Sequence, residues 1–153
     1  RTEPGGNRVI PLMLSGSHAH SIDAKGRLVL PARFRGRLGD TLYLTKGLHG
    51  CLWLFPEKEW SSLVEKLIGD SLVNSEVLEL QRFFLGSAVD CRPDDAGRII
   101  IPELLRQYAG IQRDVVTVGV GNRLEIWALE RWEAYSQALT DDRIQELGKR
   151  NKL

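Results

Sequence analysis

The sequence has little cysteine, no long apolar run and almost no net charge. Its two cysteines, Cys51 and Cys91, stand far apart and outside any metal-type or redox spacing, which fits a reduced, cytoplasmic setting. No apolar run approaches the roughly 20 residues that a membrane-spanning helix needs, so we expect no membrane partner. The formal net charge is only +1. Any role with nucleic acid must therefore depend on a local basic patch.

Motifs for catalysis, cofactors and metals are also missing. There is no Gly-x-Ser-x-Gly nucleophile motif. The segment Gly119-Val120-Gly121 joins two predicted strands, so it does not form a dinucleotide-binding loop. His18 and His20 would share one face of a strand, but no carboxylate or cysteine stands at ligand spacing. We therefore expect no enzyme, no cofactor and no metal site.

One short phrase occurs twice. Residues 23–35 and 94–106 both begin with Asp-x-x-Gly-Arg, continue with three aliphatic residues and Pro, and carry Arg four positions after that Pro. Residues 52–60 also match residues 124–132, at an offset of 72 residues, because the second copy has one extra residue between the repeated phrase and this match. Two ordered matches at a separation near 71 residues indicate an internal duplication.

Both halves predict the same elements: a strand, a tight Gly-Arg turn, a strand, a short helix, a hairpin and a longer helix. In the first half these are residues 14–22, 23–26, 28–30, 32–38, the strands 41–45 and 51–55, and a helix from 56 to 68. In the second half they are residues 88–91, 94–97, 99–101, 102–109, the strands 115–118 and 124–127, and a helix from 129. A helix capped at Asn74 and ended by Gly86 lies between them, and residues 141–149 predict a last helix.

The fold class expected is mixed α+β and β-rich, with two duplicated modules. A half of about 60 residues buries too little surface to be stable alone, so the halves should share one core or interleave strands. We assign residues 13–70 to the first module, 71–87 to a connecting helix, 88–140 to the second module and 141–153 to a C-terminal tail. Residues 1–12 are interpreted as an expression-tag remnant before Met13, with a natural flexible extension as the alternative.

Core positions follow from periodicity. The strand 28–30 is apolar on both faces and is predicted to be buried. The first long helix should bury a stripe that consists of Trp60, Leu63, Val64, Leu67 and Ile68. The four tryptophans are interpreted as duplicated core positions: Trp53, Trp60, Trp127 and Trp132.

The repeated turn has a structural role in its own right. Asp23 and Asp94 can accept hydrogen bonds from their own turn's backbone. Gly26 and Gly97 permit the left-handed conformation. The arginines that follow them, Arg27 and Arg98, can form an ion pair with the aspartate of the same turn.

The two copies differ in charge. Residues 23–37 carry five cations and one carboxylate, a net charge of +4, whereas residues 90–106 carry three cations and four carboxylates, a net charge of −1. A nearly neutral protein that concentrates basic charge on one turn and the adjacent helix is suited to contact phosphates. A simple solvated face is the alternative interpretation of such a run of charge.

The double phrase Asp-x-x-Gly-Arg, aliphatic triplet, Pro and Arg resembles the MraZ family of bacterial transcriptional regulators of the division and cell wall gene cluster. The resemblance covers about residues 13–140 and includes residues 104–110 and 124–127. It implies two AbrB-like (SpoVT-AbrB) swapped-hairpin modules that share one core. It also implies a ring-shaped homo-oligomer, a cytoplasmic and nucleoid-associated location, and binding to direct repeats in double-stranded DNA, including the protein's own promoter.

The resemblance extends to individual residues. Lys25 and Arg27 match the family's Lys-Gly-Arg and are expected to contact DNA, while Arg33 and Arg35 on the following helix are expected to contact its backbone. The second copy has Ala96 where the first has Lys25, which argues against base contacts there. Asp94 and Arg98 are therefore assigned to structure or subunit contacts.

Two other functional classes stay open at this point. One is an AbrB-like antitoxin or protein-interaction module whose main partner is a protein, although the tail from residue 141 to 153 is short for such a partner. The other is a small enzyme, for which the sequence offers no paired catalytic groups.

Overall fold

The chain folds into two copies of one arrangement of elements. The computed structural model describes residues 13–69 and 74–153. The first copy consists of β1 (Leu14–Ser21), β2 (Arg27–Val29), α1 (Ala32–Leu38), β3 (Leu42–Lys46), η1 (Leu48–Gly50), β4 (Leu52–Pro56) and α2 (Glu57–Ile68). The second consists of β5 (Val89–Cys91), β6 (Arg98–Ile100), α4 (Glu103–Ala109), β7 (Asp114–Gly121), β8 (Leu124–Ala128) and α5 (Leu129–Ala138). Helix α3 (Ser75–Ser87) lies between the copies, and α6 (Asp141–Arg150) comes last.

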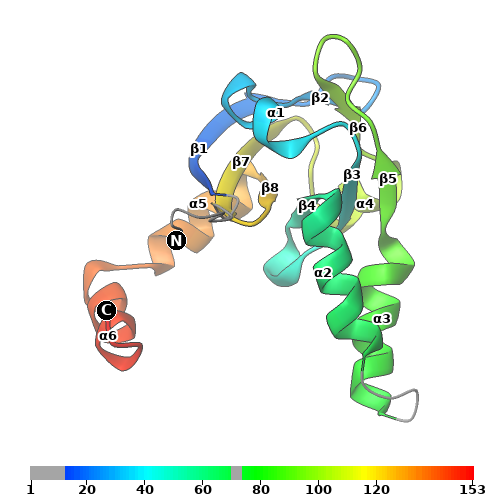
Figure 1. Cartoon of the computed structure of the whole chain (residues 1–153). Helices are drawn as coiled ribbons and strands as arrows, with labels where there is room; N and C mark the ends of the chain where they lie inside the picture. Colours follow the sequence, from blue (N-terminus) through cyan, green and yellow to red (C-terminus); the bar gives the residue numbers. More distant parts are fainter. Residues whose placement is uncertain (1–12, 70–73) are drawn as a thin grey trace, which may run out of the picture.

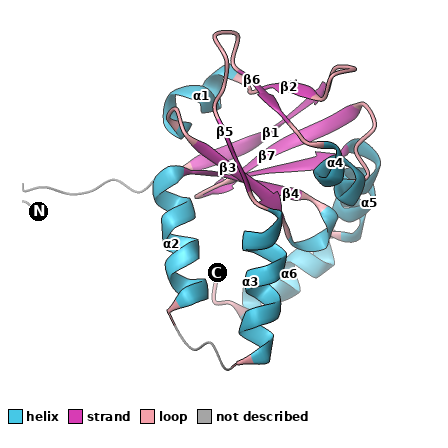
Figure 2. Cartoon of the chain, turned by 90° about the vertical axis from the view of Figure 1, so that its right-hand side faces the viewer, coloured by secondary structure: helices cyan, strands magenta, loops and turns pink. Residues whose placement is uncertain are grey.

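The strands of the two copies interleave (Figure 2). In the described part of the chain, the larger sheet has the order β1-β7-β8-β4-β3-β5, and β2 pairs with β6 in a separate two-stranded ribbon. All these pairings are antiparallel. Each copy supplies the edge strand of the other, because β1 pairs with β7 and β5 pairs with β3. Neither copy can complete its part of the sheet alone, as the small size of each half predicts.

An approximate two-fold axis relates the copies. Trp53 lies opposite Glu125 across β4 and β8, and Leu28 lies opposite Ile99 across β2 and β6. Each pair joins corresponding positions of the duplicated segments, so the axis passes between the members of both pairs. Figure 1 shows the β2–β6 ribbon at one end of the molecule, with α2 and α3 extending side by side at the other.

One apolar core joins both copies. Leu28 and Ile99, on the ribbon, are 0% and 1% exposed. They belong to the same buried cluster as the central residues of the larger sheet, which include Leu44, Leu54 and Ile126. The mixed α+β class and the duplicated modules are therefore confirmed, and the ribbon that carries both Gly-Arg turns rests on the shared core.

Four details of the predicted elements are wrong. Residues 119–121, predicted to join two strands, belong to β7 itself. Val29 is 44% exposed, because the ribbon packs on the core through one face and alternate residues of a strand point to opposite faces. Ile68 is 60% exposed at the end of α2, although Trp60 and Leu67 of the predicted stripe are buried. Helix α3 continues through Gly86 to Ser87, since an isolated glycine weakens a helix without ending it.

The predicted helix boundaries otherwise agree with the structure. The Asn74 side chain accepts hydrogen bonds from the backbone N–H groups of Glu76 and Val77 and caps α3. The predicted tag remnant, residues 1–12, and residues 70–73 of the predicted connecting segment lie outside the described residues. None of the helices in the described part combines the length and the apolar character that crossing a lipid bilayer requires.

Candidate nucleic-acid interface

The two Asp-x-x-Gly-Arg turns have the same internal bonds. One carboxylate oxygen of Asp23 accepts the backbone N–H groups of Lys25 and Arg27, each at 2.9 Å. The other accepts Nε of Arg27 at 2.7 Å. Asp94 accepts the corresponding groups of Ala96 and Arg98 at 3.0, 2.9 and 2.7 Å. Each arginine thus forms an ion pair with the aspartate of its own turn, and each aspartate accepts hydrogen bonds from its own turn's backbone.

Glycine is required at the tip of each turn. Gly26 and Gly97 have φ angles of +80° and +78°, where residues with a Cβ atom are disfavoured. The N–H of Gly26 donates to the carbonyl of Asp23 at 3.0 Å, and Gly97 donates to Asp94 at 2.8 Å. Aspartate and glycine together hold the residue between them, Lys25 or Ala96, at the exposed side of the turn.

Hydrogen bonding keeps both aspartates ionised. The pKa of Asp23 lies below its ordinary value, chiefly because of the backbone hydrogen bond from Arg27, and burial opposes the shift. The pKa of Asp94 is lowered in the same way by Arg98. Since a carboxylate that accepts hydrogen bonds prefers its charged form, each turn keeps a fixed negative charge beside its arginine.

Each turn also accepts a hydrogen bond from the other copy, across the two-fold axis. The N–H of Leu30 donates to the carbonyl of Gly97 at 2.9 Å, and the N–H of Ile101 donates to the carbonyl of Gly26 at 2.8 Å. Each turn is therefore supported by the strand end that follows the other turn. Because these bonds are reciprocal, the two tips form one structural unit.

Arg27 is held within its own turn, whereas Lys25 is exposed. Only Nε of the Arg27 guanidinium bonds to Asp23, and 32% of the Arg27 side chain is accessible. Its two terminal nitrogens remain suited to another anion, because guanidinium is a planar donor of several N–H groups. Lys25 carries no ion pair with any residue in the described part of the chain. The first turn thus presents one cation oriented by an ion pair, Arg27, and one exposed cation, Lys25.

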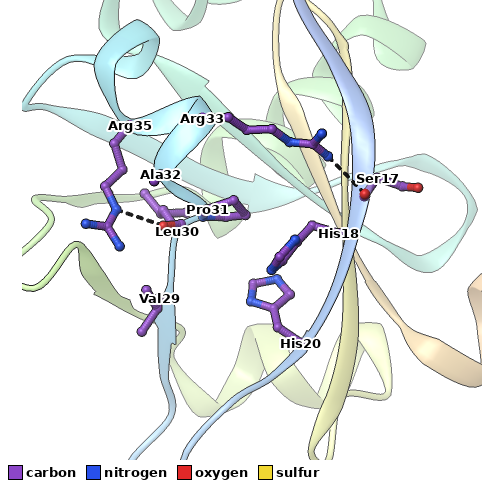
Figure 3. A pocket seen from close by; sticks show the side chains of 9 residues that line it. All are labelled: Ser17, His18, His20, Val29, Leu30, Pro31, Ala32, Arg33 and Arg35. Atoms are coloured by element: carbon purple, nitrogen blue, oxygen red, sulfur yellow. Dashed lines mark hydrogen bonds between the residues drawn. The ribbon is translucent and has the colours of Figure 1, made fainter.

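The arginines of α1 bond to backbone carbonyls (Figure 3). Arg33 donates to the carbonyl of Ser17 on β1 at 2.9 Å, and its guanidinium lies 4.9 Å from the centre of the Phe34 ring. Arg35 donates through Nε to the carbonyl of Leu30 at 2.8 Å. Arg37 donates to the carbonyl of Met13 at 2.7 Å. Arg33 and Arg37 therefore cover the outer edge of β1, where charged side chains disfavour pairing with another strand.

The structure separates the four predicted DNA-binding residues into two pairs. Arg33 and Arg35 line one open pocket of about 520 Å³ between β1 and α1. Lys25 and Arg27 lie on the turn and do not line this pocket. The pocket is lined further by Ser17, His18, His20, Val29, Leu30, Pro31 and Ala32.

Two histidines of β1 enter this pocket, as their alternation predicts. Their ring centres are 4.9 Å apart, and Nε2 of His20 lies 2.7 Å from the hydroxyl of the buried Thr117. Burial, with a smaller contribution from His18, lowers the pKa of His20 to about 4. His20 is therefore neutral at pH 7. Within the described residues, no three His, Cys, Asp or Glu side chains are placed to hold a metal ion.

The second copy lacks most of the basic side chains of the first. Ala96 corresponds to Lys25, and Leu104, which is 78% exposed, corresponds to Arg33. Arg106 alone preserves a cation of the first helix, at the position that corresponds to Arg35. Sequence reasoning included Arg106 in the repeated phrase but assigned it no role, because nothing local shows which turn its side chain contacts.

Comparison with known proteins points to one family. The family model described as "MraZ protein, putative antitoxin-like" matches residues 13–83 and, again, residues 84–152. The "Transcriptional regulator MraZ" of Thermoanaerobacter pseudethanolicus is 47% identical over 135 residues, which cover 88% of this chain and 94% of that protein. Its namesake in Lachnoclostridium phytofermentans is 45% identical over 139 residues, 89% and 98% of the two chains. That of Symbiobacterium thermophilum is 48% identical over 122 residues, 80% and 88% of the two chains.

Proposed function

The chain belongs to the MraZ family, and from this premise we propose that it is a DNA-binding transcriptional regulator. Relatives that match most of its length carry the name of transcriptional regulator. The chain concentrates basic charge on the turn and on helix α1 of one copy of its duplicated fold, and Arg35 of α1 packs on the turn of the other copy. Basic side chains on a rigid turn are suited to phosphate and base contacts.

The difference between two equivalent turns is the observation that carries this proposal. Asp, Gly and the Nε atom of Arg have the same hydrogen bonds in both turns, so these groups are explained by structure, whereas the terminal nitrogens of Arg27 are suited to another anion. Lys25 is not explained in this way, because the second turn forms with Ala96 in its place. We assign Lys25 and Arg27 to the primary DNA contact, and Arg33 and Arg35 to the DNA backbone.

The finer proposal concerns the target and the assembly. Copies of the chain would associate head to tail in a ring, and neighbouring first turns would then point in the same direction. Such an arrangement suits direct repeats about 10 base pairs apart, one per turn of the double helix. Since one turn offers few contacts, affinity would come from several subunits that bind together. The proposed targets are repeats upstream of the division and cell wall gene cluster, including the protein's own promoter. The protein itself would be cytoplasmic and associated with the nucleoid.

Fluorescence anisotropy tests this proposal. The full chain is titrated against its own upstream DNA and against a scrambled duplex across a series of salt concentrations. We expect tighter binding to the upstream DNA, and log affinity that falls linearly with log salt by about 0.9 per phosphate neutralised. Equal affinity for both duplexes would contradict sequence-specific regulation. No binding at low salt, together with capture of a stoichiometric protein partner, would favour the antitoxin-like alternative.

A further inference from the structure

Arg106 of the second copy lies against the turn of the first. It donates a hydrogen bond to the carbonyl of Ile101, just before α4. The same guanidinium covers Gly26, so a Cβ atom at position 26 would collide with it. Arg35 has the mirrored arrangement, because it donates to Leu30 and covers Gly97. The last arginine of the repeated phrase therefore packs on the turn of the opposite copy.

Every side of Gly26 is thus in contact with the protein. Its N–H donates to Asp23 within the turn, its carbonyl accepts from Ile101, and its open side lies under Arg106. Two of these three contacts come from the second copy. Gly26 is consequently buried, although Lys25 beside it is exposed. Because Gly26 joins Lys25 to Arg27, the direction of both cations depends on residues about 75 positions later in the chain.

We propose that Arg106 is a positioning residue for DNA binding. It holds the first turn in the conformation that presents Lys25 and Arg27 to phosphates, and it does not contact DNA itself. The expected effect of Arg106 on DNA binding rests on the proposed function. The support that Arg106 gives to the turn does not, because it is a property of the free protein. Through Arg106, the second copy would contribute to DNA binding by the first turn, although its own turn has no lysine.

Hydrogen exchange in the free protein tests the contact without DNA. The variant Arg106→Ala should lose protection at the backbone amides of residues 25–27 and keep it at residues 96–98. Arg35→Ala should show the reverse. Arg131→Ala is a matched control, because Arg131, like Arg106, donates to the backbone, here to two carbonyls, and lies beside glycines, Gly50 and Gly110, away from both turns. Unchanged protection of residues 25–27 in Arg106→Ala would overturn the inference, whatever the protein does with DNA.

A double-mutant cycle with Lys25→Ala tests the consequence for DNA. Arg106→Ala should lower affinity for the upstream DNA about tenfold in the wild-type background and much less in the Lys25→Ala background, since the two residues act through one turn. The salt slope should not fall further when Arg106 is removed from the Lys25→Ala protein, because Arg106 neutralises no phosphate. Equal losses in both backgrounds, or an equal loss in Arg131→Ala, would refute the positioning role. If the wild type itself does not prefer its upstream DNA, the proposed function fails. The hydrogen-exchange experiment then still shows whether Arg106 stabilises the first turn.

Discussion

Nε of Arg27 lies 2.7 Å from a carboxylate oxygen of Asp23, so an arginine proposed to contact DNA is already paired within its own turn. The same distance separates Arg98 from Asp94 in the second turn. A preformed pair lowers the conformational entropy that the arginine loses on binding, since its side chain is oriented in the free protein. Because Asp23 orients Arg27, we expect this aspartate to affect DNA binding without contacting the DNA.

Lys25 and Ala96 provide the most direct comparison between the turns. We expect Lys25→Ala to lower affinity for the upstream DNA about tenfold and to reduce the salt slope by about one phosphate. The fold should be unaffected, because the second turn forms with alanine at this position. Anisotropy across a salt series measures both quantities. Unchanged affinity, with the assembly intact by light scattering, would rule out Lys25 as a contact.

Ala96→Lys is the matched gain of charge. It places a lysine on the second turn, which has the same hydrogen bonds as the first. If DNA contacts only the first turn, this variant should strengthen non-specific binding slightly and leave the preference for the upstream sequence unchanged. A gain in that preference would show that the second turn also lies on the target.

Asp23→Asn and Asp94→Asn should separate stability from binding. Both variants lose the charged acceptor of three hydrogen bonds, so both should unfold at a lower temperature and by similar amounts. Only Asp23→Asn should also weaken DNA binding, because only its turn carries Lys25. Thermal denaturation and anisotropy measure the two effects, and an equal loss of DNA affinity in Asp94→Asn would contradict the assignment.

The same aspartates affect stability at acid pH. Their pKa values are lower in the folded chain than in the unfolded one, so their stabilising effect is present above the unfolded pKa of about 4. It is lost as the pH falls further, through the lower pKa of the folded state. Urea denaturation between pH 5 and pH 3 should therefore show a smaller loss of stability in the double asparagine variant than in the wild type.

Because of His20, the stability of the protein should fall as the pH is lowered from 6.5 to 4. Its folded pKa of about 4 lies below the ordinary 6.5, so the unfolded chain binds a proton in this range before the folded chain does, and stability falls with the pH. We expect a loss of about 1–2 kcal/mol after allowance for solvent screening at this half-buried ring. Urea denaturation at pH 7 and pH 4.5 measures it.

His20→Gln is the control for that pH dependence. Glutamine can still bond to the hydroxyl of Thr117 but does not titrate, so the variant should lose less stability than the wild type between pH 7 and pH 4.5. His18 is the titratable neighbour that lowers the pKa of His20 by its charge. Its replacement by alanine should raise the pKa of His20, as followed by NMR. An equal pH dependence in His20→Gln and the wild type would assign the effect to other groups.

The duplication and the local structure of the turns could be predicted from the amino-acid sequence. Aspartate and glycine define such a turn within five residues, and the patterns that predict strands and helices involve residues close in the sequence. These features can therefore be predicted without knowledge of the fold. The charge difference between Lys25 and Ala96 is likewise a property of the sequence alone.

The strand pairing and the groups that the arginines contact could not be predicted in this way, because they depend on how the whole chain packs. The pairing of β1 with β7 joins residues about 100 positions apart, and no local pattern distinguishes this partner from a strand of the same copy. Exposure of Val29 and the contact of Arg106 with Gly26 follow from the pairing of β2 with β6, because the two-fold arrangement places each strand end beside the opposite turn. Long side chains bond to whichever carbonyl the packed chain brings near, and packing across the two-fold axis is a property of the whole fold.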